Sequence, residues 1–230
     1  MLNAFGWDER YRVSRLEETL TPALVVYPEM IALNIARTLK LLDGDANRWR
    51  VHIKTAKLDY TLRLLIESGV CNFKCATTLE LLVACRSEAR DILLAYPALG
   101  ANARRVREIA EAFPDVRISV LAENKEQVEQ WQGSPIGVFL ENNPGMNRTG
   151  IEPSHKDEIL SLVRAVGQGF RGLHYYDGQY GGLAEGERTK AAHAGYDSLL
   201  EVVCDIERNG ARVPEVITAG TPTLPCSLAY

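Results

Sequence analysis

The sequence predicts an α/β protein: a parallel (β/α)8-type barrel that is incomplete, with seven barrel strands plus an N-terminal strand. Three observations support this fold class. Short β-rich runs alternate with longer helical patterns along the whole chain. A helical pattern separates each pair of strands, as parallel pairing requires. No Gly-rich turn follows the strand expected at 49–53, which argues against a doubly wound nucleotide-binding sheet.

The elements follow from local patterns. The N-terminal strand is expected at 23–27, and Pro28 then marks the start of a helix with apolar residues at helical spacing. The barrel strands are expected at 49–53, 70–75, 91–96, 116–121, 135–141, 169–174 and 213–218. Helices are expected at 58–68, 77–88, 102–112, 124–132, 154–166 and 187–209. Thr77 and Glu80 have the spacing of a capping box, and Asn209-Gly210 is a helix stop.

The domain organisation follows from the same count. We expect an N-terminal helical extension over 1–20 and a barrel domain over 21–230. Eight strands close the usual barrel, whereas this chain ends soon after the seventh, so the architecture is expected to be cut short. The strands at 49–53 and 213–218 would then face each other with unpaired backbone groups. We therefore expect a chain that is marginally stable or self-associates.

Composition and charge exclude several classes of protein. The 230 residues are 46% hydrophobic and 24% charged, as in ordinary globular proteins, and the net charge of -4 argues against nucleic acid or membrane as a partner. The apolar runs are too short to span a bilayer, and residues 1–20 lack the apolar core of a signal peptide. The cysteines, at 71, 75, 85, 204 and 226, form no CxxC pair, which favours reduced thiols and a cytoplasmic protein.

Four motifs fall where predicted strands end, the position at which parallel barrels gather reactive groups. The first, His52-Ile53-Lys54-Thr55, places a lysine where desolvation would lower its pKa and make it a nucleophile towards carbonyls. The second is the turn-rich loop 142–150, with glycines on both sides of Arg148. The third, Gly172-Leu173-His174-Tyr175-Tyr176-Asp177-Gly178, places two tyrosines at a strand end. The fourth, 218–223, has the small residues and hydroxyls of a phosphate cradle.

Each motif also has an ordinary structural interpretation. Most lysines near strand ends are solvated, and an arginine in a Gly/Asn/Pro loop is commonly a surface residue. Two tyrosines can pack a barrel rim, and a Thr/Gly/Pro stretch is usually a turn. Together, however, the motifs supply an amine, a cation, an aromatic ring and a phosphate cradle at one end of one barrel. That combination suits a phosphorylated aldehyde cofactor.

In their order along the chain, the motifs resemble those of the fold-type III pyridoxal-phosphate enzymes. Within that group they are most similar to the D-threonine aldolase / D-serine dehydratase family, which has an alanine racemase-like barrel. The specific part is the pair of motifs H-x-K-T and G-M-x-R-x-G. The matching stretches are Thr21-Pro22-Ala23-Leu24, His52-Ile53-Lys54-Thr55-x-Lys57, Cys75-Ala76-Thr77-x-x-Glu80, Asn143-x-Gly145-Met146-Asn147-Arg148-Thr149-Gly150, Gly172-Leu173-x-x-Tyr176-x-Gly178 and Gly220-Thr221-Pro222-Thr223.

The resemblance implies a homodimer in which a cofactor-binding barrel precedes a C-terminal β domain that is absent from this chain. It implies that Lys54 forms a Schiff base with pyridoxal 5'-phosphate and that His52 supports this lysine. Arg148 would contact the ring oxygen of the cofactor or the substrate, and Tyr176 would line the cofactor. The phosphate would be held by Thr218, Gly220 and Thr221.

The implied activity is that of a lyase on D-3-hydroxy amino acids, by aldol cleavage or dehydration. The cofactor ring would stabilise a carbanion at Cα, and Lys54 would accept the proton on one face. The family also implies a divalent metal, manganese or zinc, bound by a His and an Asp or Cys of the C-terminal domain. In this chain the cysteines at 71 and 75 and the histidines at 52, 155, 174 and 193 show no ligand spacing that would replace that site.

Three other functions stay open from the sequence. An amino-acid racemase would use the same cofactor without a metal, but with a second base on the opposite face. A non-catalytic pyridoxal-phosphate-binding protein would need only the barrel. The motifs could also be accidental, in which case the barrel would serve unrelated sugar or phosphate chemistry.

Overall fold

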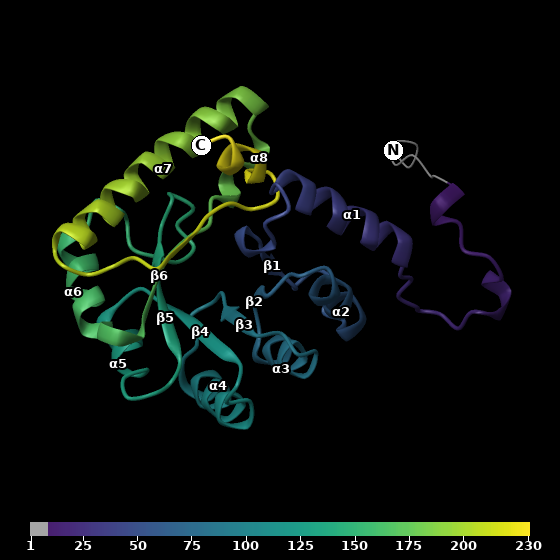
Figure 1. Cartoon of the computed structure of the whole chain (residues 1–230), viewed down its shortest axis with the longest axis horizontal. Helices are drawn as coiled ribbons and strands as arrows, with labels where there is room; N and C mark the ends of the chain where they lie inside the picture. Colours follow the sequence, from purple (N-terminus) through teal and green to yellow (C-terminus); the bar gives the residue numbers. More distant parts are fainter. Residues whose placement is uncertain (1–8) are drawn as a thin grey trace.

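The seven predicted barrel strands are all present in the computed structural model, which describes residues 9–230. They form one parallel sheet in sequential order, and Figure 1 shows them at the centre of the molecule with the helices around them. The prediction of an incomplete parallel barrel is confirmed. The strands are β1 (Arg50–His52), β2 (Asn72–Cys75), β3 (Asp91–Leu94), β4 (Arg117–Ala122), β5 (Gly137–Asn142), β6 (Phe170–Tyr175) and β7 (Glu215–Ile217).

The helices follow the predicted patterns closely, with one addition. They are α1 (Pro28–Leu41), α2 (Asp59–Glu67), α3 (Thr78–Arg86), α4 (Gly100–Ala112), α5 (Lys125–Glu129), α6 (Lys156–Val166), α7 (Glu185–Arg208) and the unpredicted α8 (Leu224–Leu228). The Thr77 side chain accepts a hydrogen bond from the Glu80 N–H at 3.1 Å, and the Glu80 carboxylate accepts one from the Ala76 N–H at 2.8 Å. The start of α3 is therefore capped from both sides. Within residues 9–230, no helix combines the length and the apolarity needed to cross a membrane.

The predicted N-terminal strand at 23–27 is wrong. These residues belong to no described strand, and Leu24 and Val25 are 73% and 45% exposed. A β-rich run forms a strand only when a neighbour satisfies its backbone groups, and this run has no described partner. Residues 1–8 of the predicted extension lie outside the described residues. Residues 9–20 hold only two short 3-10 turns, Glu9–Tyr11 and Leu16–Glu18, on a segment that extends away from the barrel (Figure 1).

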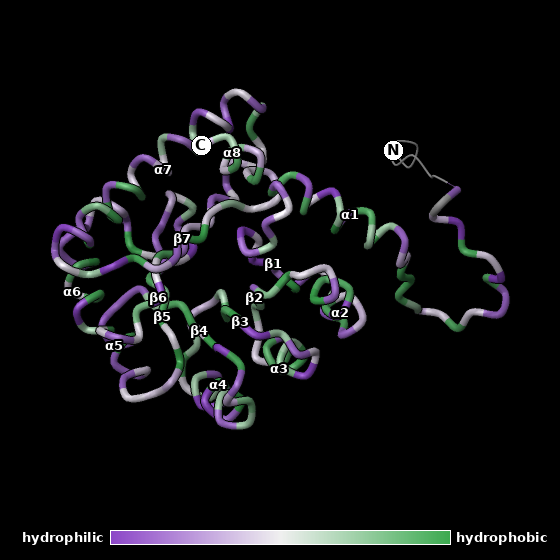
Figure 2. Tube along the Cα trace, viewed as in Figure 1, coloured by the Kyte–Doolittle hydropathy of each residue, from purple (hydrophilic) through white to green (hydrophobic). Residues whose placement is uncertain are grey.

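The barrel has two apolar cores. The larger one lies between the sheet and the helices. Figure 2 shows part of its basis, since strand β4 is largely apolar and the helices alternate between polar and apolar residues. The smaller one, formed by Leu93, Ala95, Leu121, Phe139 and Ile217, fills the inside of the barrel. Because side chains alternate between the two faces of a strand, the residues two positions before and after these also face inward, and many of them are charged.

An ion pair links the two edges of the sheet. Among the described residues, β1 pairs only with β2, and β7 only with β6. Arg50 on β1 donates two hydrogen bonds to Glu215 on β7, from Nε at 2.8 Å and from Nη2 at 2.9 Å. Its Nη1 donates to Asp91 on β3 at 2.9 Å. The facing edges expected from the sequence are present, but a buried guanidinium joins them at their amino ends.

Replacing Arg50 with methionine should lower the free energy of unfolding by about 2 to 3 kcal/mol, because Asp91 and Glu215 lose a buried partner and keep Arg171 as the cation that contacts both. Urea denaturation followed by circular dichroism measures the change. The matched control is Arg63→Met, which removes an exposed pair with Asp59 at 2.9 Å and should leave the free energy of unfolding almost unchanged, because water solvates both groups. Equal losses in the two variants would show that the Arg50 pair does not stabilise the barrel.

A bulge in β6 sets the direction of its last residues. The register with β5 shifts so that Val138 pairs with Phe170 and Phe139 with Gly172, which leaves Arg171 as the extra residue. After the bulge, Leu173 and Tyr175 pack in the outer core, whereas His174 contacts Lys74 inside the barrel. Tyr176 follows on the inner side. Without this shift, a residue such as Tyr176 would point towards the helices.

Candidate functional site

A cleft of about 560 Å³ lies between the edges β1 and β7 and extends from their amino ends to the loops at their carboxyl ends. Its lining comes from the segment before β1, from β1, β2 and β7, from the loops after β6 and β7, and from α8. Six of the seven predicted site residues line it: His52, Lys54, Tyr176, Thr218, Gly220 and Thr221. The seventh, Arg148, reaches the same place from the loop after β5 through its contact with Tyr176.

The Tyr176 ring is the point at which the motifs meet. Lys54 Nζ lies 5.7 Å from the ring centroid, and Arg148 Cζ lies 4.9 Å from it. Both distances are those of cation–π contacts. Gly220 approaches so closely that a Cβ at this position would lie 3.0 Å from Tyr176 Cε2. Four sequence motifs, separated by as many as 166 positions, therefore surround one aromatic ring.

Lys54 differs from its prediction in one respect. Its side chain is exposed and not desolvated, because Lys54 lies in the turn after β1 at the mouth of the cleft and not inside the barrel. The expectation of a buried amine at this position is wrong. The turn itself is anchored, since the Lys54 N–H donates to His52 Nδ1 at 3.3 Å.

His52 is held in its neutral form. Burial, reinforced by the nearby charges of Lys74 and Lys54, lowers the pKa of His52 to about 3. Neutral His52 accepts the Lys54 N–H at Nδ1, so its proton lies on Nε2. This polar side chain thereby fixes the backbone that carries the lysine.

The depressed pKa of His52 predicts loss of stability in acid. The unfolded histidine has a pKa near 6.5 and binds a proton below that value, whereas the folded one stays neutral, so the unfolded state takes up more protons as pH falls. The free energy of unfolding should drop by about 1 to 2 kcal/mol between pH 7 and pH 5 from this residue. Urea denaturation of wild type and His52→Gln at both pH values measures it. Parallel pH profiles for the two proteins would contradict the assignment.

The loop that carries Arg148 is built by short polar contacts. Asn143 Oδ1 accepts the N–H groups of Gly145 and Asn147, each at 3.0 Å. The Gly150 N–H donates to a carboxylate oxygen of Glu123. A Cβ on Gly150 would lie 2.8 Å from the Asn143 nitrogen, and its φ is +105°, so glycine is required here. These contacts position an otherwise exposed arginine over Tyr176.

The loop 218–223 is organised by Asp177, a fully buried residue after β6. Asp177 Oδ1 accepts from the Gly220 N–H at 3.1 Å and from Thr223 Oγ1 at 2.6 Å, and Oδ2 accepts from the Tyr196 hydroxyl at 2.7 Å. The Gly220 N–H is thus already engaged. Two other residues of this loop line the cleft and offer hydroxyl groups to an anion. They are Thr221 and Thr218, and the Thr218 hydroxyl also contacts the hydroxyl of Ser227.

The structure brings three further charged or titratable side chains to the site that sequence reasoning missed. They are Lys74 on β2, Glu141 on β5 and His174 on β6, all buried inside the barrel. Lys74 Nζ lies 3.4 Å from His174 Nε2, and His174 Nδ1 lies 2.6 Å from Glu141 Oε2. A signal was present in the sequence, since each interrupts an apolar strand, as in Asn72-Phe73-Lys74-Cys75. Strands covered by helices are otherwise almost wholly apolar.

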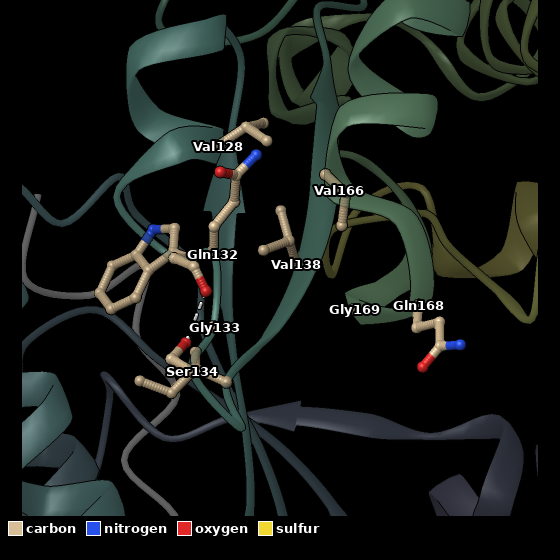
Figure 3. A pocket seen from close by; sticks show the side chains of 10 residues that line it. Val128, Gln132, Gly133, Ser134, Val138, Val166, Gln168 and Gly169 are labelled. Atoms are coloured by element: carbon tan, nitrogen blue, oxygen red, sulfur yellow. Dashed lines mark hydrogen bonds between the residues drawn. The ribbon is translucent and has the colours of Figure 1, made fainter.

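A second pocket, of about 230 Å³, lies beside α5 and the amino ends of β5 and β6, and Figure 3 shows it from close by. Its lining includes Trp131, Gln132, Ser134 and Gln168, and none of the lining side chains is titratable. It is therefore no candidate for acid–base or covalent chemistry. For residues 9–230, no group of three or more His, Cys, Asp or Glu side chains is arranged to hold a metal ion.

Comparison with known proteins identifies the family. The sequence pattern described as "Alanine racemase, N-terminal domain" matches residues 27–226, which is most of the chain. The chain belongs to the alanine racemase N-terminal domain family. This family consists of pyridoxal-phosphate-dependent enzymes of fold type III, so the resemblance drawn from the motifs is confirmed. No curated protein sequence matches the chain significantly.

Solved structures of similar fold include members with different activities. D-threonine aldolase from Filomicrobium marinum superposes with a TM-score of 0.84 at 23% identity, over 93% of this chain and 60% of that one. D-threo-3-hydroxyaspartate dehydratase from Delftia sp. HT23 gives 0.79 at 20% identity, over 89% and 56%. Alanine racemase from Bacillus anthracis gives 0.64 at 20% identity, over 84% and 50%. Such identities show the shared barrel, and the chain spans 50 to 60% of the length of these proteins.

Proposed function

We propose that this chain is the cofactor-binding barrel of a pyridoxal-phosphate-dependent lyase that acts on D-3-hydroxy amino acids. The observation that carries the proposal is the convergence of Lys54, Arg148 and Gly220 on the Tyr176 ring at the mouth of a barrel cleft. The similarity in fold to an aldolase and a dehydratase supports the choice of lyase.

The residues present fit the cofactor. A cleft of about 560 Å³ lies within the size range of pockets for small molecules. Tyr176 offers an aromatic face to the pyridine ring, and Arg148 a guanidinium to an oxygen. Thr221 and Thr218 offer hydroxyls to the phosphate, in the loop fixed by Asp177. When bound, pyridoxal 5'-phosphate supplies an electron-withdrawing ring that stabilises negative charge at Cα of an amino acid.

The chain's own residues then have distinct tasks. Lys54 Nζ would be the group that holds the aldehyde carbon of the cofactor, and its free amine would accept or donate a proton on one face of the site. Exposure of Lys54 at the cleft mouth gives the aldehyde access to its amine. Neutral His52 holds the lysine turn and adds no positive charge beside it.

The test is covalent trapping. The protein is mixed with pyridoxal 5'-phosphate, reduced with borohydride, digested and mapped by mass spectrometry. The reduced cofactor should be found on Lys54, should be lost in Lys54→Ala, and should persist in the matched control Lys57→Ala. Lys57 is an exposed lysine three positions on, paired with Glu80 at 3.4 Å. Labelling of Lys57 or Lys74 in place of Lys54, or no labelling, would refute the assignment.

The family description also favours a second candidate, an amino-acid racemase. Incubating the cofactor-loaded protein with D-threonine and D-serine, with and without manganese, separates the two. Glycine with acetaldehyde indicates aldol cleavage, pyruvate from D-serine indicates dehydration, and the L-isomer indicates racemisation. Turnover to the L-isomer alone would replace the lyase proposal with the racemase.

A further inference from the structure

Lys74 is a buried lysine without a carboxylate partner. It is 7% exposed, and no Asp or Glu oxygen of residues 9–230 lies within ion-pairing distance of its Nζ. Its one polar contact is His174 Nε2 at 3.4 Å. Burying a charged amine without a paired anion costs several kcal/mol, so such groups are rare in folded proteins. A lysine of this kind needs an explanation beyond packing.

The surroundings orient the amine. His174 Nδ1–H donates to Glu141 Oε2 at 2.6 Å, which leaves Nε2 free to accept from Lys74. Burial lowers the pKa of His174 and keeps the imidazole neutral, as this arrangement requires. An ammonium group has three N–H donors, of which His174 takes one. Lys74 lines the cleft between β1 and β7, so a ligand that fills this cleft lies beside an amine with donors that His174 does not take.

From this geometry we infer that Lys74 binds an anionic oxygen of the small molecule that fills the cleft, and that His174 and Glu141 position it for this role. The inference rests on the proposed function for the identity of that molecule. Two sources share the required chemistry, namely a phenolate or phosphate oxygen of the cofactor and the carboxylate of the amino acid. Lys54 would then bind a carbon atom of the cofactor covalently, and Lys74 would bind an oxygen atom electrostatically.

Charge around Lys74 makes ligand binding and proton binding interdependent. Burial is the main cause that lowers the pKa of Lys74 to about 8, and Glu141 opposes the shift. The other charged or titratable groups that face it come from β1, the turn after it, β6 and the loop after β6: Arg50, His52, Lys54, His174 and Asp177. An anion beside the amine favours its protonated form. Binding at pH 8 should therefore take up about half a proton from solution.

The experiment is calorimetric and needs no catalysis. The probe is 4-deoxypyridoxine 5'-phosphate, which keeps the phenolate and phosphate of the cofactor but has no aldehyde to react with Lys54. Titration at pH 8 in two buffers of different ionisation enthalpy gives the number of protons taken up. A second titration adds D-serine to the probe-saturated protein. Proton uptake in the first titration would show that Lys74 binds an oxygen of the cofactor. Proton uptake in the second would show that it binds the carboxylate of the amino acid.

Two variants separate ligand binding from a structural role. Lys74→Met should weaken the titration that shows uptake by about tenfold or more, abolish the uptake, and leave the unliganded protein at least as thermostable as wild type. Lys74→Arg, which stays protonated, should keep affinity within a few-fold and also lose the uptake. If Lys74→Met does not fold, the Lys74→Arg variant alone tests the inference. The matched control Lys57→Met should behave as wild type.

The outcomes distinguish this inference from the proposed function. Binding of the probe and of D-serine without proton uptake would overturn the role of Lys74, even if borohydride traps the cofactor on Lys54. The same holds if Lys74→Met lowers the stability of the unliganded protein and leaves affinity unchanged. Proton uptake without trapping at Lys54 would leave Lys74 as an anion-binding residue and remove the proposed role of Lys54. Failure of the probe to bind would overturn both.

Discussion

Replacing Asp177 with alanine should cost about 3 kcal/mol of folding free energy and at least tenfold in affinity for pyridoxal 5'-phosphate. Asp177 is fully buried and accepts hydrogen bonds from Gly220, Thr223 and Tyr196. Alanine leaves the Tyr196 hydroxyl without its acceptor and leaves Gly220 and Thr223 only the hydrogen bonds that they make to each other, and buried groups that lose an acceptor are costly. The loop 218–223 would then lose its attachment to β6. Urea denaturation measures the first effect, and the absorbance change on cofactor titration measures the second.

The matched control is Asp197→Ala. Asp197 also accepts a tyrosine hydroxyl, that of Tyr230 at 2.6 Å, but it is exposed on the surface of α7. Water can replace that acceptor, so we expect a change below about 1 kcal/mol and unaltered cofactor affinity. Asp177→Asn, which keeps one oxygen for Gly220 and Thr223, should fall between wild type and Asp177→Ala. If Asp177→Ala bound the cofactor as tightly as wild type, the loop would not need this anchor.

Sequence reasoning was most successful where a physical rule acts locally. Alternation of β-rich and helical runs placed all seven barrel strands, and the Thr77 cap was predicted from its spacing to Glu80. The motifs at strand ends were placed around one cleft, because the carboxyl ends of parallel strands must meet. The prediction of a strand at 23–27 was wrong because strand formation also depends on distant residues. The residue types of this segment favour a strand, but pairing depends on a neighbour that no local pattern specifies.

The side-chain contacts inside the barrel could not be predicted from the sequence, for a different reason. Nothing local shows that Arg50 meets Glu215 across 165 positions, or that Lys74 meets His174 across 100. Predicting those contacts needs the register of every strand, and the bulge at Arg171 changes the register of β6 by one residue. The exposure of Lys54 was missed for a related reason. A one-residue difference in where β1 ends decides whether its side chain enters the barrel or lies at its mouth.

Gly172→Ala should cause the largest loss of stability of any single change considered, about 4 kcal/mol or more. The φ of Gly172 is +134°, and a Cβ there would lie 1.8 Å from the carbonyl oxygen of Glu215 and 2.8 Å from its carbonyl carbon. These are backbone atoms of β7, so no side chain can rotate away. Relief requires β7 to separate from β6, which would also pull Glu215 from Arg50. Urea denaturation followed by circular dichroism measures the loss.

The same change should impair the site, because the bulge at Arg171 and Gly172 is what turns His174 and Tyr176 inward. If β6 repairs its register by expelling the bulge, Tyr176 leaves the cleft, and Lys54 and Arg148 lose the ring that both contact. Cofactor titration of Gly172→Ala under conditions where it is folded should therefore show weaker binding than wild type. Gly186→Ala is the control, since a Cβ at this α7 position meets no atom within 4 Å and should be neutral or slightly stabilising. A folded Gly172→Ala protein with wild-type cofactor affinity would mean that the bulge does not set the direction of Tyr176.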